Sequence, residues 1–240
     1  MLDRPRRLRR TEALRDLCAE THISPDGLVQ PHFALGQQDG EQPIDSLAGI
    51  SRMVIYPLLR RVEADRELGI RNVLLFGVTQ DKDPEGRTGE RQDGPAHQAV
   101  RALKDRFGAD ITVMADVCLC TYTDHGHCGL LKDGEVDNDP SLERLAQQSV
   151  SLAEAGADVI APSDMMDGRI GAIREALEDE GFPNTQIMAY SAKYASGFYG
   201  PFRDAIGTKA ALIGDKRTYQ MDPANSDEAM REIALDIQEG

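Results

Sequence analysis

The stretch Val113–Gly129 reads VMADVCLCTYTDHGHCG. It begins inside Ile111–Val117, a short apolar run with β-branched residues, which predicts a buried strand. The segment after Asp116 holds three of the chain's four cysteines and two of its five histidines. Reactive side chains that directly follow a buried strand indicate a parallel α/β fold with functional groups at the carboxyl ends of its strands.

The cysteines of this stretch predict a metal site. Cys118 and Cys120 alternate with Leu119, so an extended backbone would point both sulfurs the same way, and Cys128 follows a His-Gly-His turn that can fold back over them. Three thiolates around an open position are typical of catalytic zinc. Reduced cysteines in a loop or a disulfide are the alternatives, but the surroundings are polar and nothing indicates an oxidising compartment. We predict that the three cysteines bind zinc.

Composition argues against several partners. The 240 residues carry a net charge of −14 and a pI near 4.8, whereas nucleic-acid phosphates need a basic face. No apolar run reaches bilayer length and the arginine-rich start lacks the apolar stretch of a secretory signal, so we expect a cytoplasmic protein without a membrane partner. The early arginines fit a solvated or intersubunit arm better than an RNA-binding segment. They are Arg4, Arg6, Arg7, Arg9 and Arg10.

Helical periods, glycine stops and short apolar runs alternate along the chain. We expect residues 1–27 to form an oligomerisation arm with one helix, Glu12–Glu20, ended by the turn Ser24–Gly27, and residues 28–240 to form the catalytic domain. The predicted strands are Leu28–Leu35 (followed by a loop of glycine, glutamine and aspartate), Val73–Val78, Ile111–Val117, Val159–Ser163, Ile187–Ala192 and, more weakly, Thr218–Met221. The predicted helices are Ile50–Leu68 (with a kink or a misplaced boundary at Pro57), Ala96–Phe107, Leu142–Ala155, Gly168–Glu180, Phe202–Ile206 and Asp227–Glu239.

Repeated βα units predict a parallel sheet. No Gly-x-Gly-x-x-Gly turn follows a strand, which leaves dinucleotide binding without support. Polar residues follow many different strands, and this favours a TIM (β/α)8-type barrel over an open sheet with one crevice. Those residues are Thr79, Asp116 with Cys118, Ser163 with Asp164, and Ser191 with Lys193. Since such a barrel takes about 250 residues without an arm, we expect it to be incomplete by about two units and the sequence to be a fragment.

A second candidate group lies in Gln186–Lys193, an apolar strand that ends in lysine. Desolvation at a barrel mouth would lower the pKa of Lys193 and free its amine to form a Schiff base, although a surface lysine at the start of a loop is the simpler interpretation. The loop that follows contains aromatic residues, among them Phe202, that can wall a pocket, and Arg203 suits a carboxylate. Lys216 and Arg217 add cations. Together these residues indicate carbonyl chemistry on a small keto acid.

Four motifs carry a resemblance to a known family. They are MADVCLCTYTDHGHCG (114–129), APSDMMDGR (161–169), MAYSAKYASGFYGPFRDA (188–205) and GDKRTYQMDPAN (214–225). In this order they resemble the porphobilinogen synthase family, also called 5-aminolevulinate dehydratase, and RPRRLRRT at Arg4–Thr11 is similar to that family's arm. The resemblance implies a TIM barrel, a homo-octamer that exchanges arms, and condensation of two 5-aminolevulinate molecules to porphobilinogen with loss of water, on the path to haem and other tetrapyrroles.

The resemblance also assigns roles to individual residues. It implies that Lys193 is the first of two Schiff-base lysines and that Asp116 lines the pocket. A carboxylate at this position, beside the thiolates, can shuttle protons or order a metal-bound water. Cys118, Cys120 and Cys128 match the zinc ligands. The matching substrate-binding positions are Arg203, Lys216, Arg217, Ser163, Tyr190 and Phe202. Glu232 matches a position that in some members contacts an allosteric magnesium ion, so Mg²⁺ is a possible second cofactor.

Two departures from the family pattern bear on activity. Lys216 stands where the family usually has arginine, which weakens two-pronged carboxylate binding unless Arg217 substitutes for it. The family's second lysine, in a VKPG-like motif, would lie beyond Gly240, so we expect these 240 residues alone to be inactive, with exposed strand edges that favour aggregation.

Two other functions remain open. A Schiff-base aldolase on the same barrel would need Lys193 but not the cysteines. A truncated, non-catalytic zinc-binding relic would need the cysteines alone.

Overall fold

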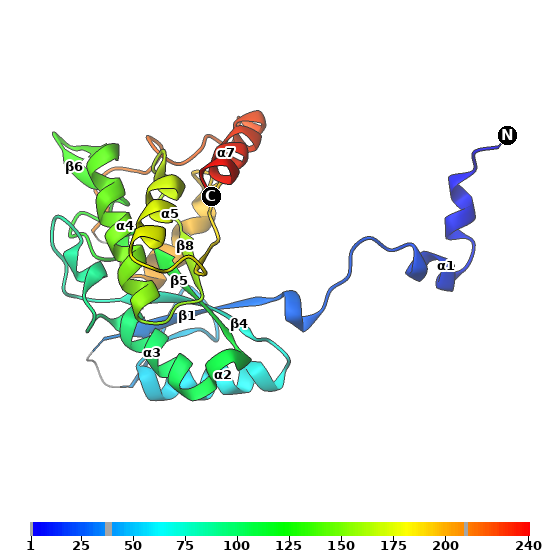
Figure 1. Cartoon of the computed structure of the whole chain (residues 1–240), viewed down its shortest axis with the longest axis horizontal. Coiled ribbons are helices and arrows are strands. Elements are labelled where there is room, and N and C mark those ends of the chain that lie inside the picture. Colours follow the sequence, from blue (N-terminus) through cyan, green and yellow to red (C-terminus); the bar gives the residue numbers. More distant parts are fainter. Residues whose placement is uncertain (1, 37–39, 209–210) are drawn as a thin grey trace.

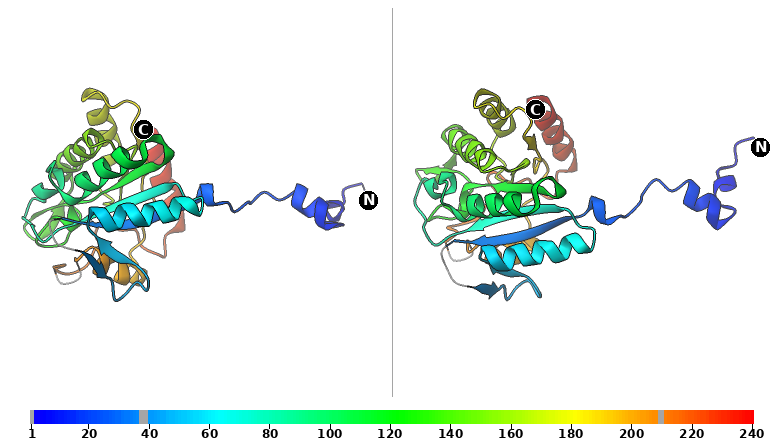
Figure 2. Two further views of the ribbon diagram at one scale, coloured as in Figure 1. Left: turned by 90° about the horizontal axis from the view of Figure 1, so that it is seen from below. Right: turned by 60° about the horizontal axis from the view of Figure 1, so that its bottom comes forward.

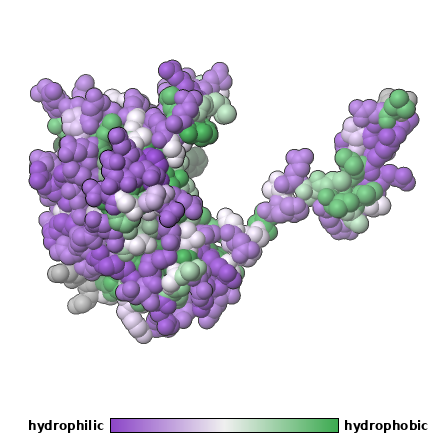
Figure 3. Space-filling model, viewed as in Figure 1, coloured by the Kyte–Doolittle hydropathy of each residue, from purple (hydrophilic) through white to green (hydrophobic). Residues whose placement is uncertain are grey.

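The computed structural model describes residues 2–36, 40–208 and 211–240. A body of layered strands and helices begins near residue 29, and the residues before it form an arm that extends from the body (Figure 1). The end of the arm contacts the body, where Asn72 Nδ2 donates to the carbonyl oxygens of Asp26 at 2.9 Å and Leu28 at 3.2 Å. The arm contains the 3-10 turn η1 (Pro5–Arg9), the helix α1 (Glu12–Leu17) and the 3-10 turn η2 (Pro25–Gly27). Its large apolar side chains are exposed and form green patches on the arm in Figure 3; they are Leu2, Leu8, Leu17 and Ile23.

The body is organised around a parallel sheet. Its main strands are β1 (Val29–Leu35), β4 (Asn72–Val78), β5 (Thr112–Val117), β8 (Val159–Pro162) and β9 (Gln186–Ile187), and each pairs in parallel with the next. On the other side of β1 lie β3 (Ser51–Met53), parallel to it, and then β2 (Glu41–Pro43), antiparallel to β3. Because parallel strands end at one edge, the segments that follow them meet there.

Most helices cover one face of this sheet (Figures 1 and 2). They are α2 (Ile55–Glu67), α3 (Pro95–Phe107), α4 (Asn138–Glu154) and α5 (Arg169–Asp179), and α7 (Ser226–Glu239) packs beside α5. The short α6 (Gly200–Ala205) lies on the other face, where Phe202 contacts Phe33 of β1 and Phe76 of β4. The remaining elements are the hairpin β6 (Leu130–Lys132) and β7 (Glu135–Asp137), and the 3-10 turns η3 (Arg87–Glu90), η4 (Gly108–Asp110), η5 (Leu119–Thr121) and η6 (Gly197–Tyr199).

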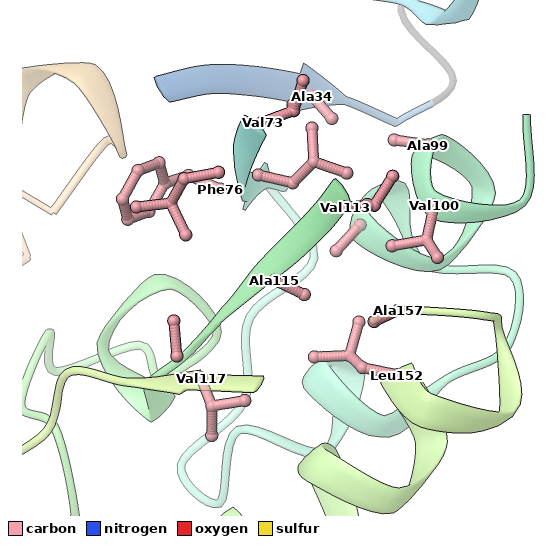
Figure 4. Close-up of a cluster of buried hydrophobic side chains, with 14 of the residues drawn as sticks. Ala34, Val73, Phe76, Ala99, Val100, Val113, Ala115, Val117, Leu152 and Ala157 are labelled. Carbon is pink, nitrogen blue, oxygen red and sulfur yellow. The ribbon is translucent and has the colours of Figure 1, made fainter. Parts of the chain in front are cut away.

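The strand β5 shows how the sequence pattern sorts side chains between the two faces. Val113, Ala115 and Val117 are fully buried and lie toward α3 and α4, near Val100 and Leu152 (Figure 4). Alternation along the strand sends the intervening side chains, including the one at position 116, to the opposite face. The apolar half of the strand thereby fixes the direction of its single carboxylate.

The parallel α/β fold and most predicted elements are confirmed, with boundary shifts of a few residues. The helix predicted from Ile50 begins at Ile55, because residues 51–53 form β3, and Pro57 therefore lies in the first turn, where its missing N–H costs nothing. The last main strand pairs over only two residues, and Thr218–Met221 forms a single bridge, Tyr194 with Met221, instead of a strand. The loop predicted after β1 falls partly on residues 37–39, outside the described residues.

Within the described residues the sheet does not close into a barrel. Its order is β2-β3-β1-β4-β5-β8-β9, and no pairing links the two outer strands. The predicted parallel α/β fold is confirmed, whereas the barrel geometry and its incompleteness stay predictions. No helix in the described ranges is long and apolar enough to cross a bilayer.

Candidate active site

The three cysteines meet at the carboxyl end of β5. Cys118 continues the extended backbone, but the chain then turns into the 3-10 turn η5, which contains Cys120. The Sγ atoms of these two residues lie 3.2 Å apart, and all three cysteine sulfurs lie within 4.8 Å of one another. Proximity was correctly predicted, yet the strand alternation we expected to produce it is wrong, because a helical turn brings the second sulfur back to the first.

The His-Gly-His turn returns the chain to the cluster without using its histidines as ligands. Gly126 has φ +72°, and a Cβ there would lie 3.0 Å from the backbone nitrogen of Leu212, so glycine suits the position. His125 Nε2 lies 3.2 Å from the carbonyl oxygen of Pro84. His127 lies 3.1 Å from the Tyr219 hydroxyl through Nδ1 and 2.8 Å from the Ile213 carbonyl oxygen through Nε2. Both imidazoles therefore tie neighbouring loops together around Cys128.

Lys193 is buried at the end of the segment that continues β9. The amides of Met188 and Tyr190 donate to the carbonyls of Ile160 and Pro162, so the parallel ladder extends past the two residues of β9. Lys193 is 8% exposed, and its Nζ donates to the Ser163 carbonyl oxygen at 2.5 Å. Lys193 is therefore a buried lysine at the end of a strand and not a solvated lysine at the start of a loop.

One small cavity of about 20 Å³ brings most of the predicted groups together. Its lining includes two predicted catalytic residues, one cysteine and four predicted substrate-binding residues: Asp116, Lys193, Cys120, Ser163, Phe202, Arg203 and Lys216. This volume holds about one water molecule. A larger hollow of about 360 Å³ adjoins it, because Lys193 and Tyr199 line both, and Tyr190 lines the larger one. Lys193 thus lies between the small polar cavity, which Cys120 also lines, and the larger hollow.

The charges at the cavity influence one another strongly. Burial raises the pKa of Asp116 to about 7, against the lowering effects of a Ser163 hydrogen bond and the Lys193 charge. Hydrogen bonds from Cys118 and Cys120, with the nearby charge of Lys216, lower the pKa of Cys128, which makes it the readiest thiolate of the three. Burial by itself lowers the pKa of Lys193, but the charges of the cysteines and Asp116 outweigh it and raise that pKa.

The three cationic residues predicted to bind a carboxylate have different surroundings. Lys216 is 6% exposed and its Nζ lies 3.1 Å from Cys128 Sγ, so it already serves the sulfur cluster. The side chain of Arg217 is 82% exposed, lies beside Asp215, and lines the pocket of Glu232 instead of the cysteine cavity, so its substrate-binding role stays a prediction. Arg203 lines the cavity and has no ion pair within the described part of the chain.

The donor set fits a zinc ion. Three sulfurs within 4.8 Å of one another can surround an ion about 2.3 Å from each, and three protein thiolates leave the fourth position open to a ligand. The two buried lysines balance part of the negative charge of the thiolates. Among the described residues, metal-ligating side chains converge at this cluster, and its three cysteines can form a zinc site with one open position.

Comparison with known proteins decides the family. The family model described as delta-aminolevulinic acid dehydratase matches residues 2–240. The chain belongs to this family. Delta-aminolevulinic acid dehydratase from Bacillus subtilis (strain 168) is 46% identical over 238 residues, which are 99% of this chain and 73% of the relative. The enzyme of that name from Methanothermobacter thermautotrophicus is 47% identical over 240 residues, or 99% of this chain and 72% of the relative.

A solved structure agrees with these relatives. Delta-aminolevulinic acid dehydratase (porphobilinogen synthase) from Toxoplasma gondii ME49, in complex with the reaction product porphobilinogen, superposes with a TM-score of 0.92 at 43% identity. The match covers 100% of this chain and 69% of that one. The resemblance seen in the sequence motifs is thereby confirmed. That the sequence is a fragment stays a prediction.

Sequence reasoning missed one polar residue of this dehydratase cavity. Gln220 is 5% exposed, lines the cavity, and its Oε1 has no hydrogen-bond partner among the described residues. It points inward because Met221 next to it pairs with the backbone of Lys193 and Ala195. No spacing in the sequence marks this residue, since the contact joins segments that are far apart along the chain.

Glu232, the predicted magnesium contact, lies elsewhere in this dehydratase fold. It is on α7 and lines a separate pocket of about 540 Å³ with Asp167 and Glu228. Burial raises the pKa of Glu232, and the charge of Asp167 raises it further. Gln220 lines both this pocket and the cysteine cavity, so the two adjoin, although Glu232 itself does not line the cysteine cavity.

Proposed function

We propose that this chain provides the first Schiff-base lysine and the metal site of a porphobilinogen synthase, which condenses two molecules of 5-aminolevulinate to porphobilinogen with loss of water, in haem and tetrapyrrole formation. That these 240 residues alone are inactive stays a prediction. One observation carries the proposal: buried Lys193 and a cysteine of the three-sulfur cluster line the same cavity. An aldolase has no use for the sulfur cluster, and a zinc-binding relic has no use for the buried lysine. The family of the chain supports the same function.

Lys193 begins the proposed reaction. Its Nζ attacks the ketone carbon of one substrate, a nitrogen–carbon bond forms, and the carbonyl oxygen leaves as water. The resulting iminium withdraws electrons, so the neighbouring carbon releases a proton more easily. A divalent cation held by the three sulfurs would offset most of the thiolate charge that raises the pKa of Lys193. Burial, which lowers that pKa, would then favour the neutral, nucleophilic amine.

Other side chains bind and position the substrate. The Arg203 guanidinium, which lines the cavity without an ion pair in the described ranges, suits the substrate carboxylate. Asp116 lines the same cavity, and its Oδ1 has no hydrogen-bond partner among the described residues, which leaves it available to accept or return a proton. Phe202, packed against Phe33 and Phe76, excludes water from this side of the cavity.

We propose zinc as the ion bound by Cys118, Cys120 and Cys128, because thiolates favour a borderline-soft cation over magnesium. When bound, zinc supplies a Lewis acid that polarises the second substrate and favours its neutral amine. Magnesium prefers oxygen ligands, and Glu232 with its neighbouring carboxylates suits that ion in the separate pocket.

The fold and assembly proposed for the enzyme extend beyond the described sheet. We propose that the parallel sheet belongs to a TIM-type barrel, since functional residues follow several of its strands. The arm carries exposed apolar side chains away from the body, which supports its role in a homo-octamer. We keep the cytoplasm as the proposed location.

Borohydride trapping tests the central step. The purified enzyme is mixed with 5-aminolevulinate, reduced with borohydride and digested, and mass spectrometry locates the added mass. We expect the label on Lys193, none in Lys193→Met, and full labelling in the control Lys132→Met, whose exposed lysine lies on the β6–β7 hairpin. A label on a different lysine of the wild-type enzyme would contradict the proposal.

A further inference from the structure

The helix α6 is held at its carboxyl end by a residue about 150 positions earlier in the chain. Arg52 on β3 donates from Nε to the carbonyl oxygen of Ala205 at 2.6 Å and from Nη2 to that of Asp204. Ser46 adds a hydrogen bond from Oγ to Asp204 Oδ2 at 2.6 Å and one to the Pro201 carbonyl at 3.2 Å. Figure 2 shows α6, in orange, close to the blue strands β2 and β3.

These contacts matter because α6 has little stability of its own. It has six residues, and an isolated helix of that length does not persist in water. The last carbonyls of a helix lack partners within the helix and carry partial negative charge, so a guanidinium with several donors in one plane satisfies them well. Arg52 therefore supplies hydrogen-bond donors for carbonyl groups at the carboxyl end of α6 that have no partners within the helix.

The sheet makes this attachment rigid. Arg52 lies opposite Phe33 in the parallel ladder between β3 and β1, and Phe33 stacks on Phe76 at 5.3 Å between ring centroids. Both rings contact Phe202 of α6, at 6.2 Å and 4.9 Å. One side of the helix is thus fixed by aromatic contacts and its end by Arg52, and both come from neighbouring strands.

The residue between these two attachments is Arg203, which lines the cavity. Phe202 is anchored just before it, and the carbonyls of Asp204 and Ala205 are anchored just after it. The direction of the Arg203 side chain is therefore set by groups on both sides of it, and Arg203 needs no partner of its own to remain at the cavity.

We propose that Arg52 and Ser46 are positioning residues that act through α6 and hold Arg203 where it binds the substrate carboxylate. This inference rests on the proposed function, in which Arg203 binds that carboxylate. Neither residue lines the cavity, so their effect on the substrate passes through the helix.

The test compares two ligands that differ in the carboxyl group, which is charged in one and a neutral methyl ester in the other. Levulinate is a keto acid like the substrate but has no amino group, and methyl levulinate has the same ketone with a neutral ester. The fraction of Lys193 trapped by borohydride is measured against the concentration of each ligand. We expect Arg52→Ala to raise the half-saturating concentration of levulinate about tenfold or more and to leave that of methyl levulinate within twofold, because geometric errors of about 1 Å at a site cost this much.

Matched variants separate positioning from general damage. Arg60→Ala, on the exposed surface of α2, should change neither ligand. Arg52→Lys keeps the charge but loses the two-pronged contact, so it should show most of the loss, and Ser46→Ala should show about a twofold to threefold loss because its bond is exposed. If Arg52→Ala does not fold, these two milder variants decide the question by the same measurement.

A double-mutant cycle gives the decisive outcome. In the Arg203→Ala background, Arg52→Ala should have no further effect on levulinate, because the group that it positions is absent. An equal loss in both backgrounds, or no loss in Arg52→Ala while Arg203→Ala weakens levulinate, overturns the inference and leaves the proposed function intact. Failure of the proposed function looks different, since Lys193 would then not be trapped in the wild-type enzyme.

Discussion

At the amino end of the sheet, Asp158 accepts hydrogen bonds from Lys104 Nζ at 2.9 Å and from the Val113 amide at 2.8 Å. At the carboxyl end of the sheet, Asp116 has an oxygen without a hydrogen-bond partner among the described residues, and Lys193 Nζ donates to the backbone carbonyl of Ser163 and faces no carboxylate partner in an ion pair within the described ranges. Paired groups stabilise a fold, whereas unpaired buried groups cost stability and are retained where a ligand needs them. The difference assigns chemistry to one end and stability to the other.

The largest effect is expected from Lys193→Met. In an active preparation of the enzyme, loss of the nucleophile should lower kcat for porphobilinogen formation at least about 1,000-fold, the order of magnitude typical of covalent catalysts, with little change in Tm. Steady-state kinetics and calorimetry measure the two quantities. A variant with more than a tenth of wild-type kcat would remove Lys193 from the mechanism and break the assignment of chemistry to the carboxyl end.

Removal of one metal ligand is expected to be the next largest effect. Cys120→Ala leaves two sulfurs, so zinc should bind at least 100-fold more weakly and kcat should fall on the order of 100-fold at limiting zinc. Borohydride trapping of substrate on Lys193 should continue, because that step needs no thiolate. Zinc content by elemental analysis is the accompanying measurement, and full turnover without zinc would favour an aldolase.

A third prediction concerns His97, a buried histidine in the first turn of α3. Burial lowers the pKa of His97 to about 4, and its Nε2 lies 2.9 Å from Ser151 Oγ. The imidazole of the unfolded chain titrates near pH 6.5, so between about pH 6.5 and 4 the unfolded state binds more protons than the folded state. The free energy of unfolding should therefore fall by roughly 2 to 3 kcal/mol as the pH is lowered from 6.5 to 4. Above pH 6.5 His97 should contribute no pH dependence.

Urea unfolding at pH 7.5, 5.5 and 4.5 measures this effect. His97→Gln should lose this part of the pH dependence, whatever its stability at neutral pH, while the exposed control His22→Gln should keep it. Identical slopes for His97→Gln and the wild type would show that the imidazole is not the group responsible.

The smallest effect is expected at the amino end itself. Asp158→Asn should lower the free energy of unfolding by about 1 to 2 kcal/mol, because one charged hydrogen-bond acceptor is replaced by a neutral one, and Tm should fall by about 2 to 6 °C. We expect kcat to stay within threefold of wild type. A tenfold loss of kcat without a loss of Tm would contradict the division of roles between the two ends.

Local patterns in the sequence predicted much of the fold and part of the site. Glycine stops and short apolar runs located β4, β5 and β8 to within a residue or two, because burial on both faces produces that pattern in parallel strands. The cysteines and Lys193 were found by residue type and position after strands. The start of α2 was misplaced because β3 has only three residues, Ser51–Met53, and a periodic pattern does not separate so short a strand from the first turn of a helix.

The sequence by itself determined which chemical groups the protein has and which strand ends carry them, since those properties depend on residues that are neighbours in the chain. Only the tertiary structure decided which of these groups meet. Lys216 reaches Cys128 across 88 positions, Arg52 reaches α6 across about 150, and Arg217 turns away to Asp215. Side-chain direction follows from packing between distant segments, and no local pattern encodes that packing.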